Sequence, residues 1–422
     1  MIQRTLHYDL APDAAAPLRF LLSAPLFALA AAALIVAWGP DLLLSRWAGP
    51  TLAVTHLLTL GYLAMAAVGA AAQLIPVVTG TSLQLAGPYA RLTWGMLCAG
   101  AGLVALGFAR GLPTVLATGG VLAASALLAV VALALRALLR PVAAPALPMA
   151  RAMRMAWPAL GATALLGAFM SVGMAGGAAL PYLALTGHHA LWGLVGFAAL
   201  LIVGVGFQVI PMFQAVAPYH PALVRTLPWG LLAGLVMWSG MGMAGAWIAI
   251  LLAGFAALTL WKLAQRRRGP DGSTLYWRLS LASVIGCAAL YLTAPQSLGL
   301  ELAMGILFIG GFVMGAVNAM LYRIVPFLLW YELQQNVKRR AGAASNAPSI
   351  RNVLPLERAE RQFYWHAAGL GLLLAALVWP VLSRPAGLVL TAAGLLLVRD
   401  LHGAARRCRR MQADARAAVQ SS

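Results

Sequence analysis

Three histidines lie in long apolar stretches, where imidazole is uncommon, and they are the side chains best suited to bind a metal. His56 lies 20 positions before Pro76, and His188 and His189 lie 23 and 22 positions before Pro211. Neutral imidazole is a common ligand of haem iron and of copper. Because three residues make nearly one helical turn, His56 and His188 are predicted to occupy the same face of equivalent helices, with His189 rotated by about 100°.

Soft and acidic side chains near the same helix ends could complete such a site. Glu301 and Met304 begin a third long apolar helix, and Met174 precedes the second. Together with the three histidines they form a mixed ligand set, of the kind that favours copper. Methionine also fills packing gaps, and the chain has 16 of them. The alternative is that the histidines cap helix ends in a protein without a cofactor.

The helices that must position these residues share a sparse pattern that ends in proline. A glycine lies fifteen residues before each proline. A small residue lies seven residues before it, and a long polar residue lies three residues before it. In that order the three sets are Pro76, Gly61, Gly69 and Gln73; Pro211, Gly196, Gly204 and Gln208; and Pro326, Gly311, Ala319 and Arg323. This repeat predicts three units of about four helices each.

The long polar residues of the repeat are predicted to form a central polar layer of Gln73, Gln208 and Arg323. Glycine lets helix backbones approach closely in lipid, which indicates that the three helices are shielded by the others. An arginine inside a membrane needs a partner. The simpler interpretation is that Arg323 reaches the inner membrane surface and that the glutamines pack without a special role.

Composition places the chain in a membrane. Hydrophobic residues make up 62% and charged residues 9% of 422, which is too little polar surface for a soluble protein of this size. Backbone groups inside a bilayer must be paired internally, so the predicted fold is an all-α polytopic membrane protein. Twelve spans are predicted, the first as a retained helix rather than a signal peptide: 18–38, 52–79, 91–110, 114–138, 156–179, 187–215, 227–244, 246–264, 277–294, 300–331, 363–382 and 385–401.

The distribution of basic residues predicts the orientation. With the N-terminus inside, most of the 29 Lys and Arg residues fall in loops after even-numbered spans and in the tail. By the positive-inside rule both termini, the loop 334–361 and the basic tail 402–422 are then cytoplasmic. The net charge of +19 follows from this asymmetry, and no aromatic and basic module indicates nucleic-acid binding. The Ala- and Arg-rich composition is typical of a bacterial inner-membrane protein in contact with the lipid bilayer.

The predicted architecture resembles the haem-copper oxidase superfamily, whose catalytic subunit has twelve helices in three groups of four. That resemblance implies a haem-ligating role for His56. Reduced relatives of the NnrS type are more similar still, with a Pro-x-Arg-Phe-like start, here Pro17-Leu18-Arg19-Phe20, and a histidine and glycine run that leads to proline and glycine, here His56, Gly61, Pro76 and Gly80.

The complete oxidase site is nevertheless missing from the sequence. Its tenth helix should carry histidines, but Glu301 to Tyr331 contains none, and neither does the seventh, Thr226 to Ala244. The sequence therefore predicts an inner-membrane protein that binds haem b or copper and handles nitric oxide or another small gas or redox ligand, without being a terminal oxidase. The alternative is a polytopic transporter or respiratory assembly factor without a cofactor, although transporters more often have twofold repeats.

Overall fold

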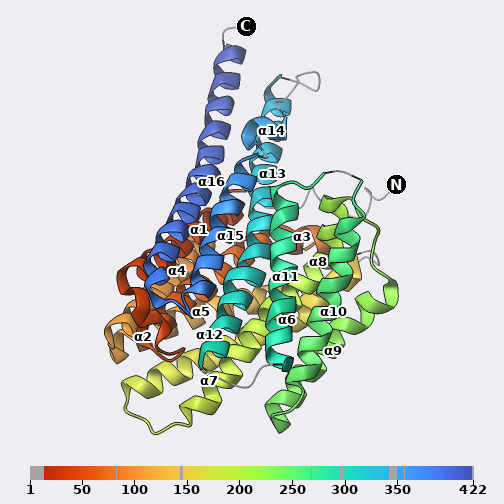
Figure 1. Ribbon diagram of the computed structural model, residues 1–422. Helices are drawn as coiled ribbons and strands as arrows, with labels where there is room; N and C mark the ends of the chain where they lie inside the picture. The colour runs from red at the N-terminus through yellow and green to blue at the C-terminus, as the bar shows by residue number, and fades with distance from the viewer. Residues whose placement is uncertain are drawn as a thin grey trace.

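The computed structural model describes residues 14–81, 83–142, 146–267, 269–293, 298–341, 349–355 and 357–420. In these ranges the regular structure is helical, with no strand (Figure 1). Eleven helices among the described residues are long and apolar enough to cross a membrane. The predicted class, an all-helical polytopic membrane protein, is therefore confirmed.

The helices follow one another as three units, in each of which the second long helix is assembled from three pieces. The first unit contains α1 (Ala15–Trp38), η2 (Gly39–Leu43), α2 (Gly49–His56), η3 (Leu57–Ala64), α3 (Met65–Thr79), α4 (Gly87–Arg110) and α5 (Pro113–Leu138). The second contains α6 (Leu147–Ala175), α7 (Tyr182–Leu191), η5 (Trp192–Ala199), α8 (Leu200–Gln214), α9 (Pro221–Met241) and α10 (Gly245–Ala264). The third contains α11 (Gly272–Thr293), α12 (Leu298–Gly305), η6 (Ile306–Val313), α13 (Met314–Ala341), α14 (Ile350–Val353), α15 (Glu357–Ala375), η7 (Pro380–Leu382) and α16 (Ser383–Gln420).

The glycine fifteen positions before each proline is a packing position. In every unit, a Cβ atom added at this glycine would clash with a side chain of the first helix of the unit. The distance would be shorter than any that real Cβ atoms show to their neighbours. The pairs are Gly61 with Phe27 of α1, Gly196 with Ala159 of α6, and Gly311 with Ser283 of α11. Each repeat helix therefore packs tightly against the first helix of its own unit, which is the close approach that small residues allow in membranes.

α15 accounts for the difference between twelve predicted spans and the eleven helices that meet the length and composition of a span. It occupies the place of the predicted span 363–382 but begins at Glu357 and ends at Ala375. Its first five residues carry four charges, so its uncharged part is short. α15 packs against α11 and α16, where neighbouring helices rather than lipid surround much of it.

Two segments predicted as a loop and a tail are more helical than expected. α13 continues to Ala341, and α14 and the start of α15 also fall inside the predicted loop 334–361, of which residues 342–348 lie outside the described ranges. α16 continues through most of the predicted tail 402–422. Its 38 residues span about 57 Å, and Figure 1 shows it protruding from the bundle.

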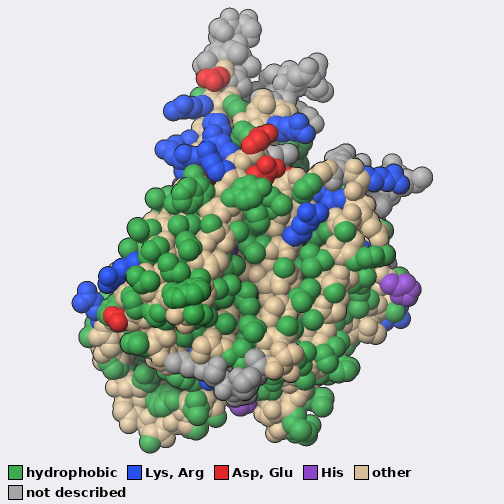
Figure 2. All heavy atoms as spheres, in the orientation of Figure 1, with side chains coloured by type: hydrophobic (Ala, Val, Ile, Leu, Met, Phe, Trp, Pro, Cys, Tyr) green, Lys and Arg blue, Asp and Glu red, His purple; other side chains and the backbone are tan. Residues whose placement is uncertain are grey.

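Charge is distributed unevenly along the bundle. Figure 2 shows Lys and Arg side chains gathered mainly at the end where α16 protrudes, while hydrophobic side chains cover the side of the bundle that faces the viewer. We call this the basic end; by the positive-inside rule it is the predicted cytoplasmic side. α7 lies at the opposite end (Figure 1).

Candidate functional site

Each repeat helix changes from α- to π-helix over eight residues. The π segments η3, η5 and η6 each contain the repeat glycine, which is followed by a buried aromatic residue: Tyr62, Phe197 and Phe312. π-helical turns are rare and are frequent at functional sites. His56 is the last residue before η3, and His189 lies three residues before η5. The π segments therefore mark the level of the candidate ligands.

The rings of His56 and His189 lie next to each other although their helices belong to different units. Their centroids are 6.1 Å apart and their planes differ by 23°. His56 Nδ1 donates to the carbonyl oxygen of Leu52 at 2.7 Å, and His189 Nδ1 donates to that of Thr163 at 3.0 Å. Because a carbonyl can only accept, each neutral ring carries its proton on Nδ1 and has its lone pair on Nε2. Metal-ligating histidines almost always donate their other ring N–H in this way.

Two neighbouring helices enclose this histidine pair. α6 makes room for the His189 ring at Gly167, where a Cβ would lie 2.9 Å from Cε1 of the imidazole. α4 contributes Phe108, whose ring centroid is 5.0 Å from that of His56. Both histidines are half-buried, so the pair is held in place by packing on one side and backbone hydrogen bonds on the other.

His188 does not join His56, contrary to the helical-phase argument. Its Nε2 lies 3.2 Å from the carbonyl oxygen of Ser239, and its ring packs edge-on against Trp238 at 5.4 Å, so it is tied to α9. The physical reason is the relation between the units. Equivalent faces of helices that belong to successive units point at successive neighbours, and two residues on equivalent faces need not meet. The partner of His56 is instead the adjacent His189.

The remaining predicted ligands are also separate from the pair. Glu301 forms an ion pair with Arg46, with 3.0 Å between Oε2 and Nε. Met304 meets Cys287 through its carbonyl oxygen, which accepts from Sγ at 3.8 Å, and Met174 is exposed. In the described part of the chain no three His, Cys, Asp or Glu side chains come close enough to hold one metal ion. The predicted five-residue set is thus reduced to two imidazoles.

A cavity of about 180 Å³, which we call the outer cavity, lies between the first and third units. Its polar lining includes the Arg46 and Glu301 pair and a buried histidine, His366, whose Nε2 donates to the carbonyl oxygen of Gly310 at 2.9 Å. His366 lies within the predicted span 363–382 and is not among the predicted ligands. Its position in the apolar part of α15 was the signal that could have identified it.

Buried polar side chains surround the base of the outer cavity. Tyr62 donates to Asn318 Oδ1 at 2.6 Å, and Tyr276 donates to Gln362 Oε1. Asn318 Nδ2 is buried and has no hydrogen-bond partner. Asn318 and Gln362 both line the cavity, so a polar group can be received there.

Gln73, Gln208 and Arg323 line a second, larger cavity together. This inner cavity has a volume of about 330 Å³ and lies between the three repeat helices and α6. The three side chains that the repeat predicted as a polar layer therefore face one shared space. Arg323 has the partner that an intramembrane arginine requires, since Nη2 lies 2.5 Å from Oδ2 of Asp271.

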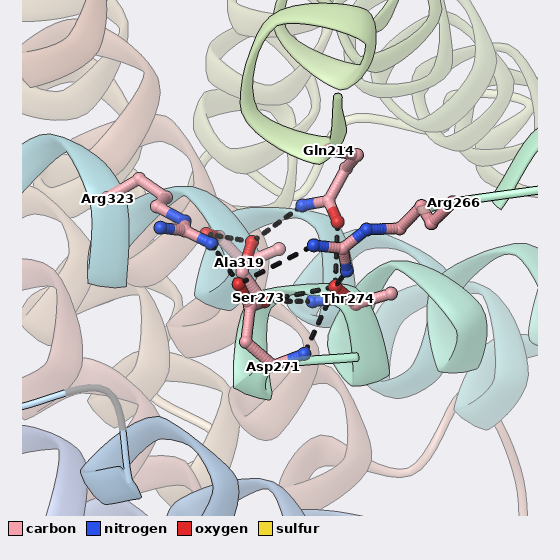
Figure 3. A network of polar contacts seen from close by, with 7 residues as sticks. All are labelled: Gln214, Arg266, Asp271, Ser273, Thr274, Ala319 and Arg323. Carbon is pink, nitrogen blue, oxygen red and sulfur yellow. Dashed lines mark hydrogen bonds and ion pairs between the residues drawn. The ribbon is translucent and has the colours of Figure 1, made fainter. Parts of the chain in front are cut away.

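Figure 3 shows the polar network that fixes Arg323. Asp271 lies just before α11 and accepts from the backbone N–H of Thr274 at 3.0 Å, as an N-cap does. Thr274 donates to Gln214 Oε1 at 2.7 Å, which ties the end of α8 to the start of α11. Burial raises the pKa of the Asp271 carboxyl, but the charge of Arg323 and the hydrogen bonds from Thr274 and Arg323 outweigh it, so the pKa lies below its usual value.

Chemically, the described residues offer a two-imidazole metal site near one end of the bundle and two cavities, apolar in most of their lining, with a few polar groups. They do not assemble the paired carboxylates or activated nucleophile of a hydrolase at these positions.

No protein-family model matches the chain, and no curated protein matches it.

Proposed function

We propose that this protein binds copper between His56 and His189 and acts in redox or nitric-oxide handling in a bacterial inner membrane, with an architecture like that of oxidase subunit I. The observation that supports the metal site is the orientation of the two rings. Both have Nδ1 committed to a backbone carbonyl, which leaves Nε2 as the ligand nitrogen. The redox role and the membrane are proposed from the resemblance to NnrS-type proteins.

The two rings are stacked with their centroids 6.1 Å apart. A metal–nitrogen bond is about 2.0–2.1 Å for imidazole, so one ion could be shared by both rings where their Nε2 atoms turn to a common point. Imidazole nitrogen suits copper, and a bound copper ion would supply one-electron redox chemistry and an attachment point for a small gas. The protein would hold both rings by the carbonyls of Leu52 and Thr163.

Haem fits these residues less well than copper. A porphyrin is larger than either the outer or the inner cavity, and neither cavity is lined by His56 or His189. Phe108 also packs directly on the His56 ring. We therefore favour a metal ion without a porphyrin.

Metal analysis of purified variants tests the proposal. The full-length protein, loaded with Cu(I) and washed, is expected to retain about one copper per chain. His56→Ala and His189→Ala should each lower copper affinity at least tenfold, whereas His188→Ala should not change it, because His188 faces α9. This variant is a matched control, adjacent in sequence and identical in chemistry.

Two outcomes would contradict the copper proposal. Equal loss of copper in all three variants would mean that the histidines act only through folding. A haem spectrum that survives both His56→Ala and His189→Ala would place the cofactor elsewhere. The copper affinities of the variants can be compared only if each variant elutes as a single folded species in size-exclusion chromatography.

A second function, transport of a small solute without a cofactor, is favoured by the two cavities. Met314 and Asn318 of α13 line the outer cavity, and Ala316, Val317 and Met320 line the inner one. The two cavities thus lie on opposite faces of the same stretch of α13. A bulky Asn318→Trp variant should block passage if the cavities form one pathway, and uptake into vesicles that is unchanged in this variant would argue against it.

A further inference from the structure

The inner cavity is long, narrow and mostly apolar. Along η3 and α3 it is lined by residues from Leu63 to Val78, a distance of about 22 Å at about 1.5 Å per residue. With a volume of about 330 Å³, a space of this length is about as wide as a single hydrocarbon chain. Small residues such as Ala66, Ala67 and Ala70 form its wall on α3.

The polar groups of the cavity are concentrated at the level of the polar layer. Gln73, Gln208 and Arg323 occupy the same register, three residues before their prolines. Trp157 lines the cavity on the side of the polar layer that is away from the basic end, and its ring packs against Phe197 at 5.9 Å. Phe197 precedes Gln208 by 11 residues, or roughly 16 Å along the helix. The polar layer lies in the middle part of the cavity, because apolar lining also continues past it to Val78 and Leu328.

Buried polar atoms without partners surround this cavity. Five such side-chain atoms occur in the described part of the chain, and three of them belong to its lining: Arg323 Nε, Gln73 Oε1 and Trp157 Nε1. Buried polar groups are nearly always paired, so an unpaired cluster around a cavity indicates a polar group that belongs to a ligand.

The two unpaired atoms of the polar layer define the head group. Arg323 Nε is a charged donor, while Nη2 of the same side chain is committed to Asp271. Gln73 Oε1 is an acceptor. An alcohol hydroxyl, or a carboxyl group that is protonated, can accept from Arg323 Nε and donate to Gln73 Oε1.

We propose that the inner cavity binds a single-chain amphiphile, a long-chain carboxylic acid or alcohol. Its head lies between Gln73 and Arg323, and its chain runs along α3 toward Trp157. The head is then at the level of the polar layer, and the chain lies among the apolar side chains of the repeat helices. This site is separate from the histidine pair, so failure of either proposal leaves the other standing.

Quenching of tryptophan fluorescence tests the binding directly. The full-length protein in lipid nanodiscs is titrated with 12-bromododecanoic acid, 12-bromododecanol and 1-bromododecane, which carry the quenching bromine at the chain end expected near Trp157. We expect saturable quenching by the acid and the alcohol and only linear, non-saturable quenching by bromododecane. Trp157→Phe should remove most of the saturable part, although the chain has 13 tryptophans. The stronger of the two ligands identifies the natural head group.

Cavity variants provide the controls. Ala70→Phe fills the wall of the cavity and should abolish saturable quenching, whereas Ala129→Phe on the exposed face of α5 should leave it unchanged. Gln73→Leu removes one head contact without filling the space and should weaken binding about tenfold. Saturation by bromododecane equal to that by the acid would overturn the proposal, and so would unaltered quenching in both Ala70→Phe and Gln73→Leu.

Discussion

His188 and His189 show how neighbouring residues of one type acquire different roles. Both donate through Nδ1 to a backbone carbonyl, His188 to that of Ala184 and His189 to that of Thr163. The Nε2 of His188 also faces the carbonyl oxygen of Ser239, whereas the ring of His189 packs against His56. A difference of one residue in a helix turns the side chain by about 100°. Whether a histidine is free to bind a metal thus depends on the atoms that its two ring nitrogens contact, and not on residue type alone.

Replacement of Asp271 by Asn should lower stability. The variant leaves Arg323 without its ion-pair partner but keeps a side-chain oxygen that can cap α11. We expect a loss of about 1–2 kcal/mol, because the pair is only partly buried. Asp41→Asn, at an exposed position in η2, is the control and should have no measurable effect. Thermal unfolding in detergent at pH 7 measures both variants, and equal midpoints would contradict the prediction.

Stability should also depend on pH through Asp271. Its pKa is lower in the folded protein than its usual value of about 3.9. Its contribution is therefore fully present above that value and is lost as pH falls through the lowered folded-state pKa. The difference in unfolding midpoint between the wild-type protein and Asp271→Asn should shrink below about pH 4. A difference that stays constant down to pH 2 would exclude Asp271 as the source.

The positions that the repeat determines could be predicted from the sequence. The contacts that depend on how the units pack against one another could not. Gln73, Gln208 and Arg323 share one register, from which the sequence predicts a polar layer; the cavity that all three line is seen only in the structure. The contact between His56 and His189 depends on how α2 and α7 lie relative to each other. No spacing within one helix contains that information, and the π segments also depart from the regular α-helical turn that the prediction assumed.

At the scale of the elements, the repeat glycines set how closely each central helix approaches its neighbour. The second glycine of the pattern behaves like the first, since a Cβ at Gly204 would overlap the Cβ of Ala152 on α6. In the third unit the equivalent position is Ala319, which is fully buried. The third helix pair therefore tolerates a methyl group where the second does not.

Gly204→Ala should destabilise the protein by about 1–3 kcal/mol, because α6 and α8 must separate to admit the methyl group. Gly254→Ala in α10 is the matched control, since a Cβ there meets nothing within 4 Å. It should be neutral or stabilising by up to about 1 kcal/mol from helix propensity. Unfolding midpoints of the two variants compare the effects, and a similar change in both would show that close packing is not responsible.

Element lengths were predictable only where the hydrophobic pattern sets them. The predicted span 246–264 agrees with α10, Gly245–Ala264, within one residue. By contrast, α16 extends to Gln420, well beyond its apolar part. Its basic continuation contains good helix formers such as Ala, Arg and Gln, and hydropathy alone does not register them.

At the scale of the whole molecule, the role of α15 decides on which side of the membrane the C-terminus lies. Eleven crossings would place the two termini on opposite sides, and twelve would place them on the same side. The uncharged part of α15 is short, but α11 and α16 pack against it. Basic residues gather at the end where α16 protrudes (Figure 2). By the positive-inside rule this favours a crossing by α15.

Reporter fusions can count the crossings. Green fluorescent protein fused after residue 422 is expected to fluoresce, because it folds in the cytoplasm. Alkaline phosphatase fused after Val378, between α15 and α16, should be active, because that position is then periplasmic. The reverse pattern, a dark C-terminal fusion and an inactive fusion at Val378, would show that α15 does not cross. A phosphatase fusion after Gly111 is a periplasmic control.

The three π segments also carry information about ancestry. Each holds an extra residue within a turn, and all three begin 19 or 20 positions before the repeat proline. One insertion in a single four-helix precursor, copied when that unit was duplicated, accounts for all three more simply than three independent events. The extra residue would then be older than the three-unit chain, and the different residues found 22 positions before each proline, Val54, His189 and Met304, would record what each copy has become since.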